Sequence, residues 1–470
     1  MPVQPGPNTD SGTGTNPDGW PAPPEDDDSP RGESMTDPRT DARSTFALDV
    51  DTGSYTRFRD ALAQGHGVPR DEVRTEEFVN YFRQDYETPS DGLDVSIDAA
   101  VLPFRPSHRI VRVGIASAEV SDEDRRDADL VLVVDCSGSM RQAGKMETTK
   151  AALRTLVGSL RRTDRVAIVC YSSRARVALD PTPVAERESV LAAIDELEPQ
   201  SSTNAAEGLA LGYDLAGEMR GDDDRMTRVV LVSDGVANVG ETDAGGILER
   251  MSSRARDGIS LISVGVGITT YDDELLEQLA DRGDGWHVYV DGQEEAERVF
   301  ATGLTSSLVV AGRDAKAQVE FDPGQVAGYR LIGYENRMVS DRDFRNDAVD
   351  GGEVFAGRTT TALYEVEMRR GAGRDAFVRA TVRYLDEDGE PVERRRHLAD
   401  VECAAELEET SPRLRQDVVI AMLTDHLVGG PWSQWVGPDV LREEAEALPE
   451  LLDGDPDVAQ LVELVQRATA

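Results

Sequence analysis

Residues 128–140 read Ala-Asp-Leu-Val-Leu-Val-Val-Asp-Cys-Ser-Gly-Ser-Met, and this stretch decides the fold. The near-continuous apolar run from Leu130 to Val134 contains several β-branched residues and no polar alternation. Such a run is typical of a central parallel strand that helices cover on both faces. Ligands of parallel sheets bind just beyond the carboxyl ends of their strands. The stretch therefore predicts a buried strand that ends in a functional loop.

The loop after this strand carries Asp135, Ser137 and Ser139. Their spacing by two can place one carboxylate and two hydroxyls on the same side, and Gly138 lets the backbone turn closely. Two later stretches add similar groups: a polar loop that leads into a helical pattern offers Thr203, and a second apolar strand at 228–233 ends in Asp234. Oxygen atoms of this kind suit a hard divalent cation.

In this order, and at these strand ends and loop mouths, the residues resemble the metal-ion-dependent adhesion site of a von Willebrand factor type A domain. That motif is Asp-x-Ser-x-Ser, followed later by Thr and then by Asp. The resemblance implies a divalent cation, with Mg²⁺ expected and Mn²⁺ or Ca²⁺ as alternatives. The implied ligands are Asp135, Ser137, Ser139, Thr203 and Asp234.

Charge explains how such a site can bind a partner. Two carboxylates neutralise a divalent ion, and hydroxyl ligands add no further negative charge. Mg²⁺ takes about six oxygen ligands and keeps several waters, so a position stays open for a carboxylate supplied by a protein ligand. The resemblance therefore predicts an adhesion-type protein-binding module and not an enzyme.

Two other functions stay open at this point. An intracellular assembly factor that works with an ATPase partner is favoured by the start of the sequence, which has no signal peptide pattern. A metal-dependent hydrolase is less favoured, because Ser137 and Ser139 do not lie in Gly-x-Ser-x-Gly and no general base stands beside the candidate ligands.

Helical and strand patterns alternate from residue 127 to residue 308, which predicts a doubly wound parallel α/β sheet of Rossmann-like type. Expected helices lie at 145–160, 184–197, 205–219, 244–257, 272–281 and 293–307, and expected strands at 165–171, 228–233, 260–266 and 286–290. Residues 93–120 and 309–400 instead alternate with period two, and Asp388-Gly389 favours a hairpin turn. We expect one β-rich domain, into a loop of which the α/β domain is inserted.

The ends of the chain differ from this core. Residues 1–43 are rich in Pro, Gly and acidic residues and predict a disordered linker. Residues 44–92 and 401–470 predict small helical parts, and Ser411-Pro412 begins one of the C-terminal helices. The flanking segments resemble a bacterial family that has an N-terminal type-A-associated segment and a C-terminal domain of unknown function.

Several smaller predictions come from single residues in these flanks. Asp49 and Asp51 could form a metal or phosphoryl-transfer pair, but capping of the next helix by Asp51, Thr52 or Ser54 is favoured. We expect Trp432 and Trp435 to pack between the last two helices.

Composition limits the partners and the compartment. The formal net charge of −40 opposes binding to nucleic acid or to an anionic membrane surface, and no apolar run is long enough for a membrane span. Only three of the 50 basic residues are lysine, which we interpret as genomic or salt bias. Cys136 and Cys170 are expected to be small buried hydrophobes rather than a disulfide or a thiol nucleophile. The family resemblance favours an extracytoplasmic or cell-surface location, with the cytoplasm as the alternative, and the oligomeric state stays open.

Overall fold

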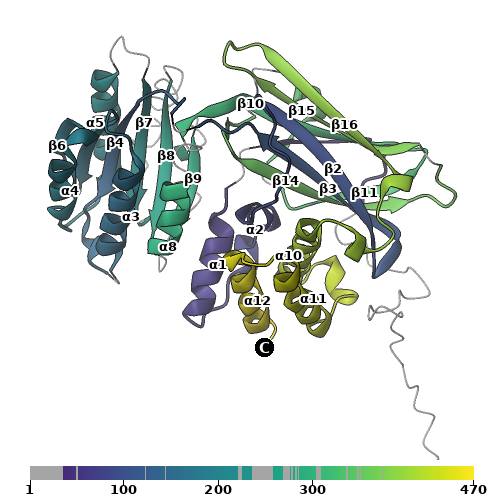
Figure 1. The fold of residues 1–470 in the computed structure, drawn as a ribbon. Helices are drawn as coiled ribbons and strands as arrows, with labels where there is room; N and C mark the ends of the chain where they lie inside the picture. The colour runs from purple at the N-terminus through teal and green to yellow at the C-terminus, as the bar shows by residue number, and fades with distance from the viewer. Residues whose placement is uncertain are drawn as a thin grey trace, which may run out of the picture.

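The computed structural model describes residues 35–48, 51–121, 123–142, 144–220, 225–235, 258–267, 276, 279–280, 283, 285–302, 308–334, 337–346, 349, 351–373 and 375–470. Figure 1 shows three parts: a sheet flanked by helices, a pair of antiparallel sheets, and a group of helices from both ends of the chain. None of the described helices is both long and apolar enough to cross a membrane.

The first part is a mainly parallel sheet whose strands run in the order β6-β5-β4-β7-β8-β9, with only β6 antiparallel. Its strands are β4 (Ala128–Asp135), β5 (Arg165–Tyr171), β6 (Ala175–Pro183), β7 (Met226–Ser233), β8 (Ile259–Val266) and β9 (Trp286–Val290). Its helices are α3 (Lys145–Ser159), α4 (Arg187–Asp195), α5 (Ala205–Met219) and α8 (Gln293–Ala296), the last continued by a π-helical turn at Glu297–Thr302.

Strand β4 lies in the centre of this sheet and is buried on both faces. Leu130, Leu132 and Val134 belong to the core cluster that includes α3 and α4. Val131 and Val133 point the other way, into the cluster formed with α5. Because successive side chains of a strand point to opposite faces, an apolar run without alternation is what burial on both faces requires.

The second part consists of two antiparallel sheets packed face to face around one core. One sheet has the order β11-β14-β3-β2, and the other has the order β12-β1-β10-β15-β16, with β13 paired to β10. The strands are β1 (Arg43–Ala47), β2 (Leu93–Leu102), β3 (Arg105–Ser117), β10 (Val310–Phe321), β11 (Val326–Ile332), β12 (Met338–Val339), β13 (Val354–Phe355), β14 (Thr359–Met368), β15 (Ala376–Leu385) and β16 (Pro391–Ala399).

The third part joins helices from opposite ends of the chain around a single core cluster. In Figure 1, α1 and α2 lie beside α10 and α12. The helices are α1 (Gly53–Ala63), α2 (Thr75–Tyr81), α10 (Pro412–Val428), α11 (Pro438–Leu451) and α12 (Pro456–Ala468). Ser411 caps α10 by accepting a hydrogen bond from the Leu414 amide, and Pro412 occupies the first turn, as predicted.

The predicted fold class is confirmed: an α/β sheet lies between two stretches of β structure that share a sheet, because β3 pairs with β14. The hairpin turn at Asp388-Gly389 is also found, between β15 and β16. The edge strand β6 and the strand β1 were not predicted. The segment assigned to a linker also differs, since Thr36 forms a bridge with Tyr329.

Some predictions concern residues outside the described part of the chain. These are the linker at 1–34, Asp49, the helix at 244–257, most of the helix at 272–281 and the residues 303–307 at the end of the last predicted α/β helix.

The prediction that a side chain caps α1 is wrong. Thr52 is the N-cap residue of α1, but no side chain there makes a capping hydrogen bond. Asp51 instead accepts hydrogen bonds from the Arg337 guanidinium at 2.9 Å and the His287 amide at 3.1 Å. Trp432 and Trp435 share a core cluster with residues of α11 and α12, and Trp432 also packs against Phe104, at 5.2 Å between ring centroids. In both cases the partner is distant in sequence, so local pattern could not reveal it.

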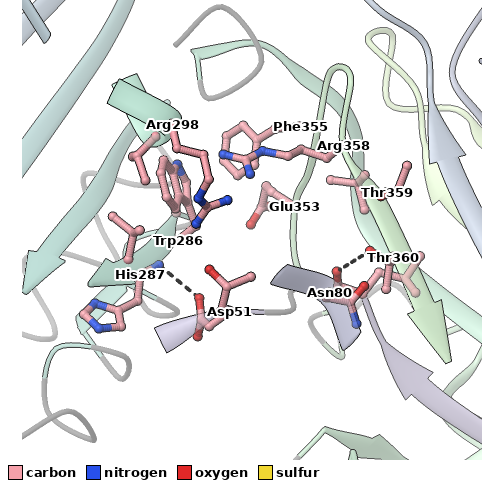
Figure 2. A pocket seen from close by; sticks show the side chains of 16 residues that line it. Asp51, Asn80, Trp286, His287, Arg298, Glu353, Phe355, Arg358, Thr359 and Thr360 are labelled. Atoms are coloured by element: carbon pink, nitrogen blue, oxygen red, sulfur yellow. Dashed lines mark hydrogen bonds between the residues drawn. The ribbon is translucent and has the colours of Figure 1, made fainter. Parts of the chain in front are cut away.

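Asp51 lines a cavity of about 90 Å³ where the three parts meet. Figure 2 shows side chains facing this cavity from the N-terminal segment, from the β9 and α8 region, and from residues 353–360. The Arg358 guanidinium lies 5.1 Å from the Trp286 ring. Trp286 begins β9, the last strand of the parallel sheet, and β7 and β8 lie between β9 and β4.

Candidate metal centre

The carboxyl end of β4 brings three predicted site residues into contact. Asp135 ends the strand and is fully buried, and its Oδ1 accepts a hydrogen bond from the Ser137 amide at 2.7 Å. The hydroxyl oxygens of Ser137 and Ser139 lie 2.8 Å apart. Ser139 is partly exposed, whereas Ser137 is buried. The loop therefore presents a continuous row of oxygen atoms that runs from the sheet interior toward solvent.

Gly138 allows a second loop to lie directly against the first. Its amide donates to the carbonyl of Ser201 at 3.0 Å, and a Cβ atom at position 138 would lie 2.7 Å from the same oxygen. The Gln200 amide also donates to the carbonyl of Cys136, at 2.7 Å. These two backbone hydrogen bonds hold the segment before α5 against the loop after β4. The two segments can lie this close because position 138 is glycine, whereas a larger residue would overlap the Ser201 carbonyl.

Thr203 lies in this second loop, two residues beyond Ser201, and is partly exposed. Asn204 follows as the N-cap of α5 and accepts a hydrogen bond from the Glu207 amide at 3.2 Å. Within the described residues, the Thr203 hydroxyl makes no hydrogen bond. The structure therefore places Thr203 beside the β4 loop but not in direct hydrogen-bond contact with Ser137 or Ser139.

Asp234 follows β7, which pairs with β4 in parallel register. It is fully buried, and its Oδ2 accepts a hydrogen bond from the Lys145 ammonium at 3.0 Å. Burial raises the pKa of Asp135 to about 6, and the nearby Asp234 charge also raises it. The two predicted acids therefore lie at adjacent strand ends and within electrostatic reach of each other.

The chemistry of this donor set fits a hard divalent cation, since all its groups are oxygens. Among the described residues there is no group of three or more His, Cys, Asp or Glu side chains that could hold a metal ion. The candidate centre is of a different type, with two acids and three hydroxyls. The structure places the five residues at one edge of the sheet, and their assignment as ligands stays a prediction.

With this sheet topology and the order of these residues described, the chain can be compared with known protein families. The sequence model of the von Willebrand factor type A domain matches residues 129–301. A model described as von Willebrand factor matches residues 27–112, and one described as the C-terminal part of the uncharacterized protein YfbK matches residues 306–404. Residues 129–301 form a von Willebrand factor type A domain. The chain shares with YfbK-like proteins the order of an N-terminal segment, a type A domain and a YfbK C-terminal part.

The uncharacterized protein YfbK of Escherichia coli is 34% identical over 336 residues, which is 69% of this chain and 58% of that protein. The chain thus spans little more than half of that relative. Inter-alpha-trypsin inhibitor heavy chain H2 of Sus scrofa is 27% identical over 189 residues, covering 38% of this chain and 19% of the other. A solved von Willebrand factor type A protein from Catenulispora acidiphila has 15% identity and a TM-score of 0.43, with 82% of this chain and 98% of that chain covered.

Two side chains of the type A domain that sequence reasoning missed support Asp135. The Tyr171 hydroxyl and the Ser233 hydroxyl both donate to Asp135 Oδ2, each at 3.2 Å. Burial and the Asp135 charge raise the pKa of Tyr171, so its phenol keeps the proton that it donates. Both residues end strands next to β4, and the rule that sites form at strand ends could have nominated them.

A disulfide joins Cys136 to Cys170 in the type A domain, with their Cα atoms 5.8 Å apart. The prediction that both cysteines are unbonded buried hydrophobes is therefore wrong. The parallel pairing of β4 with β5 aligns Val134 with Cys170, which brings the two cysteines together although 34 positions separate them in sequence. Cys136 lies between Asp135 and Ser137, so the disulfide fastens the candidate metal loop to the neighbouring strand.

Proposed function

We propose that the type A domain is a metal-ion-dependent protein-binding module of the adhesion type. Asp135, Ser137, Ser139, Thr203 and Asp234 would hold a divalent cation, with Mg²⁺ expected and Mn²⁺ or Ca²⁺ as alternatives. The protein partner would supply a carboxylate to the ion. The observation that carries the proposal is the contact between the Ser137 and Ser139 hydroxyls directly above a buried Asp135, with Asp234 at the adjacent strand end.

The support is chemical. Hydroxyl ligands fill coordination positions without lowering the charge of the ion, and two carboxylates are few for a divalent cation that takes about six oxygens. An ion held in this way attracts a further anionic ligand. Ser139 and Thr203 are partly exposed, so the side of the site that they line is accessible to a protein surface.

We prefer a binding role to catalysis. The Ser137 side chain contacts the Ser139 hydroxyl and the Asp135 carboxylate, and such a set of oxygens suits a cation. A contact between Ser263 and His287, at 2.6 Å, lies in the type A domain, but Ser263 is fully buried and its hydroxyl donates to the carbonyl of Leu276. That pair fits a structural role.

The disulfide supports an extracytoplasmic location. Disulfides form and persist in oxidising compartments and are rare in the cytoplasm of most organisms. The Cys136–Cys170 bond lies beside the candidate ligands, where a free thiol would itself compete for metal ions. An exported binding module agrees with these facts better than a cytoplasmic assembly factor.

The proposal is tested by titrating the metal-free protein with Mg²⁺ and Mn²⁺ in a calorimeter and by recording thermal unfolding with and without EDTA. A ligand at 100 times its Kd stabilises the folded state by about 2.7 kcal/mol, which is a measurable shift in Tm. The Asp135→Ala variant should lose both the heat and the shift. Asp127→Ala, which changes a partly exposed acid just before β4, is the control and should keep both.

Absence of heat and of an EDTA effect in the unaltered protein would exclude the metal site. The partner is sought by crosslinking in living cells with the unaltered protein and with the Asp135→Ala variant. A protein captured only by the unaltered chain, and lost on EDTA treatment, is the expected result. Capture that is equal for the two would contradict metal-dependent binding.

A further inference from the structure

The three lysines of this chain occupy unusual positions. Lys145, Lys150 and Lys316 are 3%, 9% and 0% exposed, although lysine is among the residues least often buried. Lys150 and Lys316 donate to backbone carbonyls, of Asp195 at 3.0 Å and of Asn346 at 2.9 Å. Lys145 differs, because its hydrogen bond goes to the buried carboxylate of Asp234, a predicted metal ligand.

The space around Lys145 is shaped for a lysine. It is the first residue of α3, and its unbranched stem passes directly over Gly267, which follows β8. A Cβ atom at Gly267 would lie 2.6 Å from both Cγ and Cε of Lys145, and Gly267 has φ +78°, which favours glycine. The stem therefore fills the space that a side chain at 267 would take, and the ammonium ends at Asp234.

The ammonium changes the charge of the candidate centre. Asp135 and Asp234 contribute two negative charges, and Lys145 contributes one positive charge in contact with Asp234. A divalent cation added to these three groups leaves a net charge of +1, whereas the same ion with the two acids alone would be neutralised. Charges act strongly on one another at this distance and burial, since the effective dielectric constant is well below that of water.

We infer that Lys145 is a fixed counter-ion of the metal centre, which holds Asp234 in position, weakens cation binding, and leaves the bound cation with excess positive charge for the carboxylate of a partner. This inference rests on the proposed function. Lys145 acts through Asp234 and is a positioning residue, not a ligand. The three effects have one cause, which is a lysine ammonium in contact with one of the two acids of the site.

The test compares Lys145→Met with the unaltered protein in the full-length chain. Methionine keeps an unbranched apolar stem of similar length but removes the charge. With the metal ion alone as the probe, we expect Mn²⁺ and Mg²⁺ to bind at least tenfold more tightly to the variant in calorimetric titration. The metal-free variant should also melt lower than the unaltered protein, because Asp234 has lost a buried cation, and saturating Mn²⁺ should restore most of the loss.

Lys150→Met is the matched control, because Lys150 is a buried lysine of the same helix whose ammonium donates to the Asp195 carbonyl, away from the candidate ligands. It should leave the Kd for Mn²⁺ within twofold of the original. Lys145→Gln is the second variant, since it keeps a hydrogen-bond donor toward Asp234 while it removes the charge. It should also bind Mn²⁺ more tightly, which separates loss of charge from loss of the hydrogen bond.

The outcomes distinguish the inference from the function on which it rests. Unaltered protein that binds metal, together with Lys145 variants that bind it equally or more weakly, would overturn the inference and leave the metal site intact. Equal loss of Tm with and without Mn²⁺ would show that Lys145 is merely structural. If the unaltered protein binds no divalent cation, both the inference and the proposed function are wrong.

Discussion

Asp417 is a fully buried acid in α10 whose surroundings make its protonation matter for stability. Burial raises its pKa to about 6, although hydrogen bonds from Gln84 at 2.9 Å and from Arg112 at 3.3 Å oppose this shift. A raised pKa in the folded state means that the folded protein holds the proton more tightly than the unfolded chain does. The contribution of the protonated Asp417 to the free energy of unfolding is therefore fully present below about pH 4, and it is lost as pH rises through about 6.

Replacement of this acid by its neutral isostere gives the first prediction. The Tm of Asp417→Asn, compared with that of the unaltered protein, should rise progressively between pH 4 and pH 7, because the variant has no carboxyl group to ionise. Over this range the free energy of unfolding of the variant, relative to that of the unaltered protein, should rise by on the order of 3 kcal/mol. Thermal unfolding at half-unit pH steps measures it. Asp439→Asn, at an exposed acid, is the control and should follow the unaltered protein.

At the residue scale, spacing within one loop and the resemblance to a known motif nominated the candidate ligands but not the residues that support them. Asp135, Ser137 and Ser139 are recognisable because they follow one buried strand at intervals of two. The supporting side chains are Lys145, at the start of a helix, which contacts Asp234, and Tyr171, in a neighbouring strand, which contacts Asp135. The low number of lysines was an available signal that the remaining lysines have specific roles. We interpreted it as compositional bias because burial is not visible in a sequence.

The disulfide links two elements, β5 and the loop after β4, and gives a prediction at that scale. A bond that closes a loop of this length stabilises the folded state by about 3–4 kcal/mol in the loop-entropy description. The double variant Cys136→Ala with Cys170→Ala should melt lower than the unaltered protein, and a reductant should lower the Tm of the unaltered protein but not of the variant. Cys403→Ala, which removes the free cysteine, should keep the response to reductant.

Close packing of α5 on β4 gives a second prediction at the element scale. A Cβ atom added at Gly212 of α5 would overlap the side chain of Val133. Gly212→Ala should destabilise the protein by about 1–2 kcal/mol, since overpacking outweighs the better helix propensity of alanine. Gly158→Ala in α3 is the contrasting variant, because only the end of the Arg187 side chain lies near it, at 3.2 Å. It should be neutral or stabilising in urea-induced unfolding.

The strands and helices of the type A domain were largely predictable, because their hydrophobic periods are local. Predicted and observed bounds agree for β5, β9 and α5, and α3 ends one residue earlier than predicted. Strand β6 was missed because it is an edge strand with mostly exposed or half-buried side chains, so no apolar pattern marks it. Strand β1 was missed because its partner, β10, lies far away in sequence: Arg43 pairs with Glu320 and Ala47 with Lys316.

On the scale of the whole molecule, Arg59 connects the N-terminal helices to the type A domain. From α1 it donates to Asp291 at 2.7 and 2.9 Å and to Glu295 at 3.0 Å, and the Tyr81 hydroxyl donates to Glu295 as well. Glu295 is almost completely buried. Removal of one partner from a buried ion pair is costly because the other charge stays in the interior.

Arg59→Met should destabilise the docking of the type A domain, but by less than the about 3 kcal/mol of a fully broken buried pair, because Glu295 keeps its ion pair with Arg298. In scanning calorimetry we expect the unfolding transition of the variant to split or broaden, as the type A domain unfolds at a lower temperature than the rest. Arg83→Met, at an exposed ion pair with Asp85, is the control and should leave the transition unchanged. A single, unshifted transition for Arg59→Met would show that the contact contributes nothing.

The sequence by itself determined the parallel sheet, the order of its elements and the acids and hydroxyls at its carboxyl edge. It could do so because burial on both faces and spacing within a loop are properties of neighbouring residues. Only the tertiary structure decided that Cys136 bonds Cys170, that Lys145 meets Asp234, and that Tyr55 and Gln460 from opposite ends of the chain lie in contact. These pairs depend on which elements lie side by side, and that is fixed by the packing of the whole chain.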